Sequence, residues 1–180
     1  MGKQITINSN IVIPEVKIID CFAAEDQRGT FIKVFNENIY NELGIKTNIR
    51  EIFYSISKKD VIRGLHYQDN PCAQEKIVYV ISGSIKDIIV DIRKDSKNFG
   101  KVAEIELSAN DTKAIYIPQG FAHGFRVLED NTIMVYNVSE GYNKECDKGV
   151  LWSSIEYDWD VSNPILSERD KSFISIYDLK

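Results

Sequence analysis

The chain contains only two histidines, and each lies in a stretch that is typical of a β-strand. The first, His66, occurs in "VIRGLHYQ", where Arg63 and Gly64 precede it. Imidazole changes its charge near neutral pH and can remove a proton from a carbon acid, whereas arginine binds phosphate through paired hydrogen bonds. Because strict alternation would place Arg63 and His66 on opposite faces of a strand, we expect a twist or bulge at Gly64 that brings both into one pocket.

The second histidine, His123, lies in "YIPQGFAHGF", where Pro118 and Gly120 indicate a turn after a strand. This P-x-G-x-x-H pattern resembles the second half of the cupin signature. Metal-binding cupins use a set of three histidines, which two cannot supply. Carboxylates could in principle complete a metal site, but we expect a pocket without a metal ion or other cofactor. Taken alone, the motif fits equally well a turn whose histidine hydrogen-bonds to the backbone.

Four further residues are candidates for the same site, each with a structural alternative. Lys76 and Arg28 are either solvated surface charges or parts of a diphosphate site, which the second Arg-Gly step in "EDQRGTF" favours. Tyr136 in "TIMVYNVSEGY" is either a core aromatic or a site residue. Asp170 in "LSERD" forms with Ser167 the S-x-x-D pattern of a helix cap, but it could instead orient a histidine. The residues alone leave these alternatives open.

Short strands must position these side chains. Strand-like runs rich in β-branched and aromatic residues include "RGTFIKVF", "REIFYSIS", "EKIVYVIS", "GSIKDIIVDIR", "KVAEIELS", "KAIYIP", "HGFRVLE" and "TIMVYNVS". Asn36 and Ser167 are candidate caps of short helices, the first ending at Gly44. We therefore expect an all-β fold, a jelly-roll (cupin-like) β-barrel with short helices near the N- and C-terminal regions. We expect one domain over residues 1–180, with an N-terminal arm over 1–20 and a C-terminal segment over 160–180.

The composition indicates which classes of partner and which cellular compartment to expect. A net charge of −5 without a basic block argues against nucleic-acid binding. No stretch approaches the roughly 18 apolar residues of a membrane span, and "MGKQITINSN" has no signal-peptide pattern. Cys21, Cys72 and Cys146 are far apart and form no CxxC pair, so we expect three free thiols in a reducing cytoplasm.

Together these motifs resemble one family. "RGLHYQ", "VDIRKDS", "IPQGFAHGF", "VYNVSEGY" and "ILSERD" are similar in order and spacing to the dTDP-4-dehydrorhamnose 3,5-epimerase family, over about residues 26–170. The resemblance implies a homodimeric jelly roll that needs no metal. It implies as substrate a nucleotide-diphosphate 4-keto-6-deoxy sugar, epimerised at C3, C5 or both by proton abstraction and return next to the keto group, in deoxysugar and surface polysaccharide biosynthesis.

The resemblance also implies roles for individual residues. His66 would be the base, Asp170 would fix its tautomer, and Tyr136 would return a proton from the opposite face of the sugar. Lys76 would stabilise the enolate oxygen. The implied substrate-binding residues are Arg63 and Arg28 at the diphosphate, with Arg28 reaching across the dimer, His123 in the pocket, and Tyr142, Phe31 and Glu51 toward the nucleotide.

Departures from the family pattern raise alternatives. Lys33 stands where the family usually has glutamate, and Glu51-Ile52-Phe53 stands where it reads Gln-Asp-Asn. These positions lie toward the nucleotide, so the nucleotide is either dTDP as in the family or a CDP or GDP group with a different base edge. Three other functions compete with 3,5-epimerisation: a mono-epimerase at C3 or C5 only, a sugar-nucleotide 3,4-ketoisomerase, and a non-catalytic sugar-binding cupin.

Overall fold

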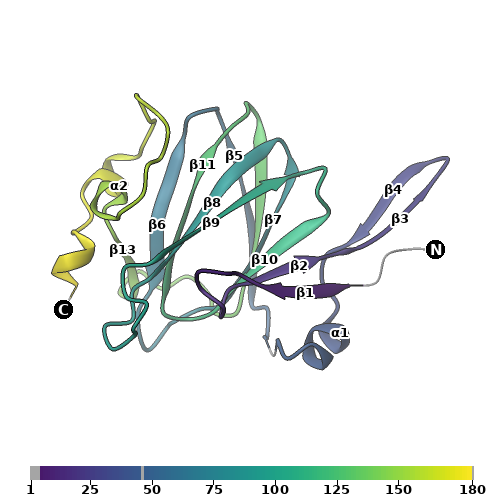
Figure 1. Ribbon diagram of the computed structural model, residues 1–180, viewed down its shortest axis with the longest axis horizontal. Helices are drawn as coiled ribbons and strands as arrows, with labels where there is room; N and C mark the ends of the chain where they lie inside the picture. The colour runs from purple at the N-terminus through teal and green to yellow at the C-terminus, as the bar shows by residue number, and fades with distance from the viewer. Residues whose placement is uncertain (1–4, 46, 180) are drawn as a thin grey trace.

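The computed structural model describes residues 5–45 and 47–179 and folds most of them into two stacked antiparallel sheets (Figure 1). The first sheet has the strand order β1 (Thr6–Ser9), β2 (Lys17–Asp20), β10 (Lys113–Ile117), β7 (Lys76–Ser82), β12 (Thr132–Val138) and β5 (Glu51–Ser57). The second has the order β13 (Asp147–Gly149), β6 (Ile62–Gln68), β11 (Phe121–Val127), β8 (Ser84–Asp91) and β9 (Val102–Ser108).

The main core lies between these two sheets. It joins apolar side chains from both, among them Val78 of β7, Ile89 of β8, Phe125 of β11 and Met134 of β12, all of them buried. Burying such side chains between two sheets is the principal stabilising term for an all-β domain of this size. The predicted all-β jelly roll is confirmed, although the described strands form two separate sheets rather than one closed barrel.

A second apolar cluster places the C-terminal segment on the outer face of the five-stranded sheet. Ile62 of β6 and Ile88 of β8 pack there with Trp159 and Ile176. The segment includes the 3₁₀ turns η1 (Trp152–Ser154) and η2 (Ile176–Asp178) and the short helix α2 (Glu168–Lys171). Figure 1 shows α2 beside β6, and this packing brings a residue far along the chain next to the strand that carries His66.

Both helix predictions are confirmed. Asn36 caps α1 (Glu37–Glu42) through its side-chain oxygen, which accepts a hydrogen bond from the Ile39 amide at 3.1 Å. Ser167 caps α2 in the same way, accepting from the Asp170 amide at 3.0 Å. A side-chain acceptor satisfies one of the amides that the first turn of a helix leaves unpaired.

The strand-like runs of the sequence all contain strands. Four strands were not expected: β1 and β2 in the expected N-terminal arm, β3 (Phe22–Asp26) and the short β13. β1 and β2 extend the six-stranded sheet by pairing with each other and with β10. Isolated from the sheet these segments are too short or too polar to be recognised as strands. Their pairing depends on the neighbour, not on local preference.

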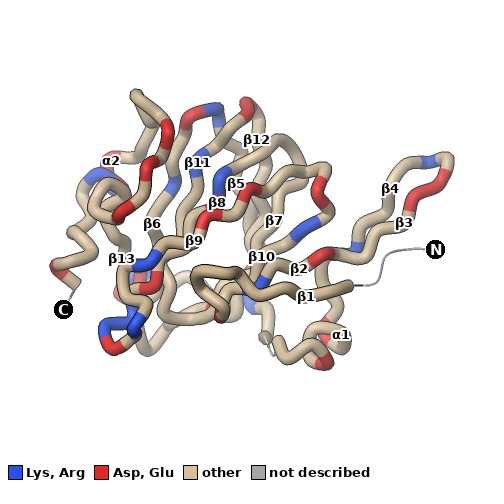
Figure 2. The backbone as a smooth tube through the Cα atoms, viewed as in Figure 1, with Lys and Arg blue, Asp and Glu red and all other residues tan. Residues whose placement is uncertain are grey.

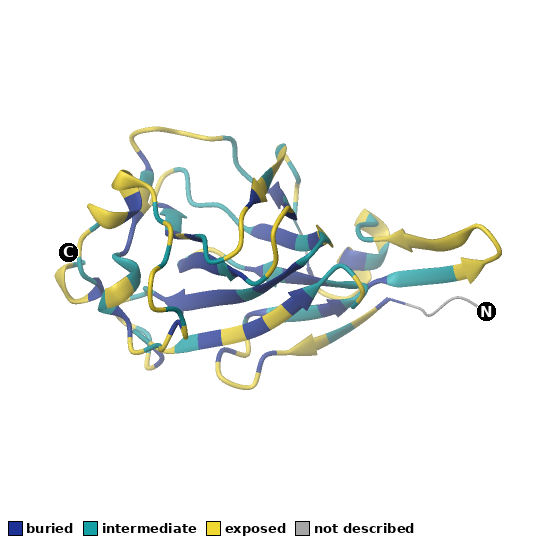
Figure 3. Ribbon diagram, turned by 90° about the horizontal axis from the view of Figure 1, so that it is seen from above, coloured by how far each residue is buried: buried dark blue, intermediate teal, exposed yellow. Residues whose placement is uncertain are grey.

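The hairpin of β3 (Phe22–Asp26) and β4 (Gly29–Lys33) projects away from the two sheets (Figure 1). Figure 3 shows it mostly exposed, in contrast to the strands of the core. Its tip carries acidic and basic residues together (Figure 2), including the ion pair between Asp26 and Arg28. The hairpin therefore presents side chains beyond the body of its own chain.

The expectation of three free thiols is wrong. Cys72 and Cys146 form a disulfide, with their Cα atoms 5.9 Å apart, and only Cys21 is free. The two cysteines lie 74 positions apart in the sequence, in loops that the fold brings together, so spacing alone could not reveal the pair. Cys21 is buried elsewhere, in a cluster under β2 and α1.

Among the described helices, none has the length and apolar character needed to cross a bilayer.

Candidate active site

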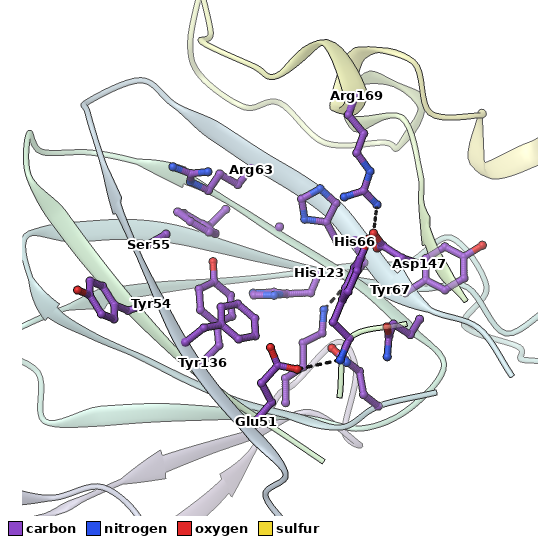
Figure 4. A pocket seen from close by; sticks show the side chains of 17 residues that line it. Glu51, Tyr54, Ser55, Arg63, His66, Tyr67, His123, Tyr136, Asp147 and Arg169 are labelled. Carbon is purple, nitrogen blue, oxygen red and sulfur yellow. Dashed lines mark hydrogen bonds and ion pairs between the residues drawn. The ribbon is translucent and has the colours of Figure 1, made fainter. Parts of the chain in front are cut away.

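A pocket of about 440 Å³ lies between strands of the two sheets (Figure 4). It is lined by side chains of β5, β6, β7, β11 and β12, and by Tyr142, Asp147 and Arg169 from the later part of the chain. The predicted site residues that line it are His66, Tyr136, Lys76, Glu51, Arg63, His123 and Tyr142. The structure thus brings together residues that the sequence scatters over five strands and a loop.

His66 and Asp170 form a hydrogen-bonded pair at one side of the pocket. The His66 Nε2 and Asp170 Oδ1 atoms are 2.8 Å apart, and the other Asp170 oxygen accepts from the Gly64 amide at 3.2 Å. Burial alone would raise the pKa of Asp170, but the hydrogen bond from His66 and the Gly64 amide outweigh it and hold the pKa below its ordinary value. A carboxylate at Nε2 makes that nitrogen the donor, which leaves Nδ1 with a lone pair. Asp170 is therefore both part of a helix cap and the orienting partner of His66.

The expected irregularity at Gly64 is present. Two residues of β6, Gly64 and Leu65, lie opposite the single Gly124 of β11, between the pairs His123–His66 and Phe125–Arg63. Gly64 has φ +132°, and a Cβ there would lie 2.6 Å from the Gly124 Cα atom. This bulge is what allows Arg63 and His66 to line the same pocket.

Lys76 lies at the base of the pocket and is only 8% exposed. Its Nζ donates to the His66 carbonyl oxygen at 3.1 Å. Burial lowers the pKa of Lys76 to about 8, although the carboxylates of Asp87 and Asp147 favour the charged form. The ammonium is therefore still the main form at neutral pH, and it can stabilise negative charge that develops in the pocket.

His123 is buried in a second histidine–aspartate pair. Its Nε2 lies 2.7 Å from Oδ1 of Asp87, which has no exposed surface. Burial lowers the pKa of His123 even though Asp87 favours the imidazolium. The other Asp87 oxygen has no hydrogen-bond partner within the described part of the chain. His123 is thus held as a neutral side chain in a fixed orientation.

Tyr136 comes from β12 in the opposite sheet and is buried to 9% exposure. Its ring stacks on Phe53 at 4.7 Å between centroids and lies edge-on to His123 at 6.2 Å. Burial raises the pKa of Tyr136 far above its ordinary value, so the phenol stays protonated. Figure 4 shows Tyr136 and His66 on opposite sides of the pocket, with His123 between them.

The outer part of the pocket carries charged and amide groups. The Glu51 carboxylate accepts from the Tyr142 amide at 2.8 Å, and the Arg63 Nε donates to the Ser57 hydroxyl at 3.0 Å. Arg169, next to Asp170 in the chain, pairs with Asp147 at 2.7 Å. Arg63 and Arg169 thus place two guanidinium groups at the pocket wall, where a diphosphate could bind.

Two predicted binding residues, Arg28 and Phe31, do not line this pocket. Both lie on the exposed β3–β4 hairpin, where the Arg28 side chain is 85% exposed and Phe31 is 60% exposed. Lys33 lies on the same hairpin, with its ammonium over the Phe22 ring. Of the other departures from the family pattern, Glu51 and Phe53 line the pocket and Ile52 points away from it.

Comparison with known proteins shows the family of this chain. The family model described as dTDP-4-dehydrorhamnose 3,5-epimerase matches residues 10–178. The chain belongs to the dTDP-4-dehydrorhamnose 3,5-epimerase family. A relative of that name from Shigella flexneri is 44% identical over 161 residues, 88% of this chain and 89% of the relative. Another, from Escherichia coli K12, is 37% identical over 93% of this chain and 92% of its own.

Solved structures of the same family have the same fold. The epimerase from Bacillus anthracis, with TDP and PPi bound, has a TM-score of 0.91 and 35% identity, covering 96% of this chain and 99% of its own. The enzyme from Legionella pneumophila, in complex with dTDP-4-keto-L-rhamnose, has a TM-score of 0.92 and 33% identity, covering 98% and 95%. Nucleotide and sugar-nucleotide binding are thus recorded for proteins closely similar to this epimerase-family chain.

Some residues of this epimerase-family pocket were missed by sequence reasoning. Asp87 had a signal, since it is a carboxylate directly before the apolar run Ile88-Ile89-Val90 of β8. Asp147 and Arg169 had none, because each belongs to a polar stretch and their pairing depends on the fold of the C-terminal segment. Among residues 5–45 and 47–179, no group of three or more His, Cys, Asp and Glu side chains is placed to hold a metal ion.

Proposed function

We propose that this protein epimerises a dTDP-linked 4-keto-6-deoxy sugar at C3 and C5. The observation that carries this proposal is the pairing of an oriented base, the His66–Asp170 pair at 2.8 Å, with a protonated phenol, Tyr136, from the opposite sheet. Inverting a carbon requires a proton to leave one face and a proton to arrive at the other. A base and an acid held by two facing sheets meet that requirement.

In the proposed reaction, Nδ1 of His66 removes the proton from the carbon next to the C4 keto group. The electrons of that C–H bond form an enolate, whose oxygen is stabilised by the Lys76 ammonium. Tyr136 then donates its phenolic proton to the other face of the carbon, and the keto group is restored. Asp170 supports the imidazolium that forms, as its lowered pKa implies.

The nucleotide diphosphate would occupy the outer part of the pocket. Arg63 and Arg169 are the cations there, and Tyr142, Phe53 and Glu51 provide aromatic and polar surface for a base. Relatives with TDP or a dTDP-sugar bound support dTDP as the nucleotide. Glu51 uses one carboxylate oxygen to hold the Tyr142 amide, which gives it a role in the pocket wall that does not depend on the base.

The test of this proposal is a panel of 4-keto-6-deoxyglucose substrates linked to dTDP, CDP and GDP, followed by proton NMR. We expect conversion of the dTDP sugar to the product inverted at C3 and C5, and tighter calorimetric binding of dTDP than of CDP or GDP. A product inverted at one carbon would indicate a mono-epimerase, and a keto group moved to C3 would indicate a ketoisomerase. Binding without any product would contradict catalysis, and a preference for CDP or GDP would contradict the assignment of the nucleotide.

We also propose that the protein acts as a homodimer. β5 is an edge strand, and Ile52, Tyr54 and Ile56 on its outer face are 65%, 66% and 57% exposed. A long apolar edge strand is a liability unless a partner covers it. A second copy that covers this edge would also account for the projecting β3–β4 hairpin, which carries Arg28 and Phe31 and could reach the neighbouring pocket.

A mixing experiment tests whether Arg28 acts in the neighbouring pocket. We expect Arg28→Ala and His66→Ala each to be nearly inactive alone, whereas refolding them together at equal concentration should restore activity in roughly one quarter of the sites. Only a mixed dimer contains a pocket in which both residues are intact. The control is a mixture of His66→Ala with Asp170→Asn, whose defects lie in the same pocket and cannot complement. Equal recovery in both mixtures, or none in either, would contradict Arg28 acting across a dimer.

A further inference from the structure

The disulfide between Cys72 and Cys146 joins two loops of the pocket wall. Cys72 lies in the 69–75 loop between β6 and β7, and Cys146 ends the 139–146 loop between β12 and β13. The first loop contributes Gln74 to the pocket, and the second contributes Tyr142. A covalent bond between the loops thus fixes the relative positions of two lining side chains.

Hydrogen bonds hold the same two loops together without the disulfide. The Gln74 side chain donates to the Glu140 carbonyl oxygen at 3.2 Å, and the Asp69 amide donates to that of Cys146 at 2.8 Å. Gln68, at the end of β6, donates to the Cys72 and Gly141 carbonyl oxygens at 3.0 and 3.1 Å. The reduced protein therefore keeps contacts that maintain the fold, while the loops lose their covalent constraint.

The disulfide is also connected to the proposed base. Asp147 directly follows Cys146 and pairs with Arg169, which directly precedes Asp170. A shift of Cys146 would therefore move Tyr142 at the nucleotide side of the pocket and, through Asp147, would also move Arg169.

Cys72 is half-buried and Cys146 is 6% exposed, so a thiol from solution would attack Cys72.

We propose that Cys72 and Cys146 form a reversible dithiol/disulfide couple that sets the affinity of the pocket for its nucleotide. A thiolate of an external dithiol attacks the Cys72 Sγ, forms a mixed disulfide and releases Cys146 as a thiolate. The second thiol of the reductant then displaces Cys72. Two electrons and two protons pass to the protein, which gains two thiols, and the dithiol becomes a disulfide. The oxidised protein has the ordered, higher-affinity pocket.

The state of the cysteines is measured first and does not depend on the proposed function. Alkylation after denaturation, followed by mass spectrometry, should label one cysteine in the oxidised protein and three after treatment with dithiothreitol. Air or a disulfide such as oxidised glutathione should restore the single label. Three labels under every condition would show that the bond does not form and would overturn the proposal.

The coupling is measured by calorimetry with dTDP and by amide hydrogen exchange of the 139–146 loop. We expect reduction to weaken dTDP binding by roughly three- to tenfold and to accelerate exchange at the Tyr142 and Asn143 amides, because the loop must be ordered again on binding. Cys72→Ser should behave as the reduced protein under both conditions. Cys21→Ala, which removes the remaining thiol, should respond to dithiothreitol as the unmodified protein does.

The outcomes separate this inference from the proposed function on which its affinity readout rests. Equal dTDP affinity and equal loop exchange in the two redox states would overturn the inference, even if reduction lowered the melting temperature, because the disulfide would then only stabilise the fold. Absence of dTDP binding in both states would contradict the proposed function. In that case the loop exchange alone would decide the inference, and exchange that does not change on reduction would overturn it.

Discussion

Replacing His66 by alanine is expected to lower kcat/KM by roughly 10²- to 10⁴-fold, the contribution of a positioned general base. The imidazole is the group that Asp170 orients toward the pocket, and its Nδ1 is the free basic atom. The affinity for dTDP should change little, because the diphosphate is assigned to Arg63 and Arg169. Steady-state kinetics and calorimetry with dTDP measure the two effects separately.

Asp170→Asn is the companion variant for this prediction. It retains the imidazole but replaces the carboxylate that supports the imidazolium, so we expect a smaller loss than for His66→Ala. A near-normal rate of proton abstraction in His66→Ala would show that another group is the base. A large loss of dTDP affinity in that variant would show instead that His66 contributes to binding, and the assignment of its role would be wrong.

Replacing Tyr136 by phenylalanine is expected to separate proton abstraction from inversion. The change removes only the phenolic oxygen from a buried ring that stacks on Phe53, so the packing should be retained. His66 would still form the enolate and return hydrogen to the same face. In heavy water, deuterium should therefore enter the substrate with retained configuration, while inverted product forms at least roughly 10²-fold more slowly.

The matched control for this variant is Tyr177→Phe, which makes the same chemical change at a tyrosine that is 70% exposed and lies outside the pocket. It should leave both exchange and inversion unchanged. Equal losses of exchange and inversion in Tyr136→Phe would indicate that the phenol takes part in forming the enolate, and the assignment of opposite faces would then be wrong.

The extent to which this site could be predicted depended on local motifs. His66, His123 and Asp170 lie in short patterns whose residue types already suggest chemistry, and the bulge at Gly64 follows from the need to place Arg63 beside His66. The choice between cap and catalytic partner for Asp170 could not be made locally. It required the packing of the C-terminal segment on the five-stranded sheet, and the structure shows that Asp170 both belongs to the helix cap and hydrogen-bonds to His66.

What the sequence could not reveal depends on contacts between distant segments. The disulfide joins cysteines whose loops become neighbours only when β12 pairs with β7 and β13 pairs with β6. Arg169 acquires its partner Asp147 for the same reason. Arg28 and Phe31 illustrate the opposite case, since the family resemblance assigns them to a binding site but neither lines the pocket of the described chain. Their role therefore stays a prediction, which the mixing experiment with Arg28→Ala tests.

In the proposed reaction, His66 and Tyr136 act on opposite faces of a carbon next to a keto group. The most direct test is to incubate the unmodified protein with dTDP-4-keto-6-deoxyglucose in heavy water and to follow C3 and C5 by NMR. We expect deuterium to replace hydrogen at both carbons as inverted product forms. Tight binding of the sugar nucleotide with no deuterium at either carbon would contradict it.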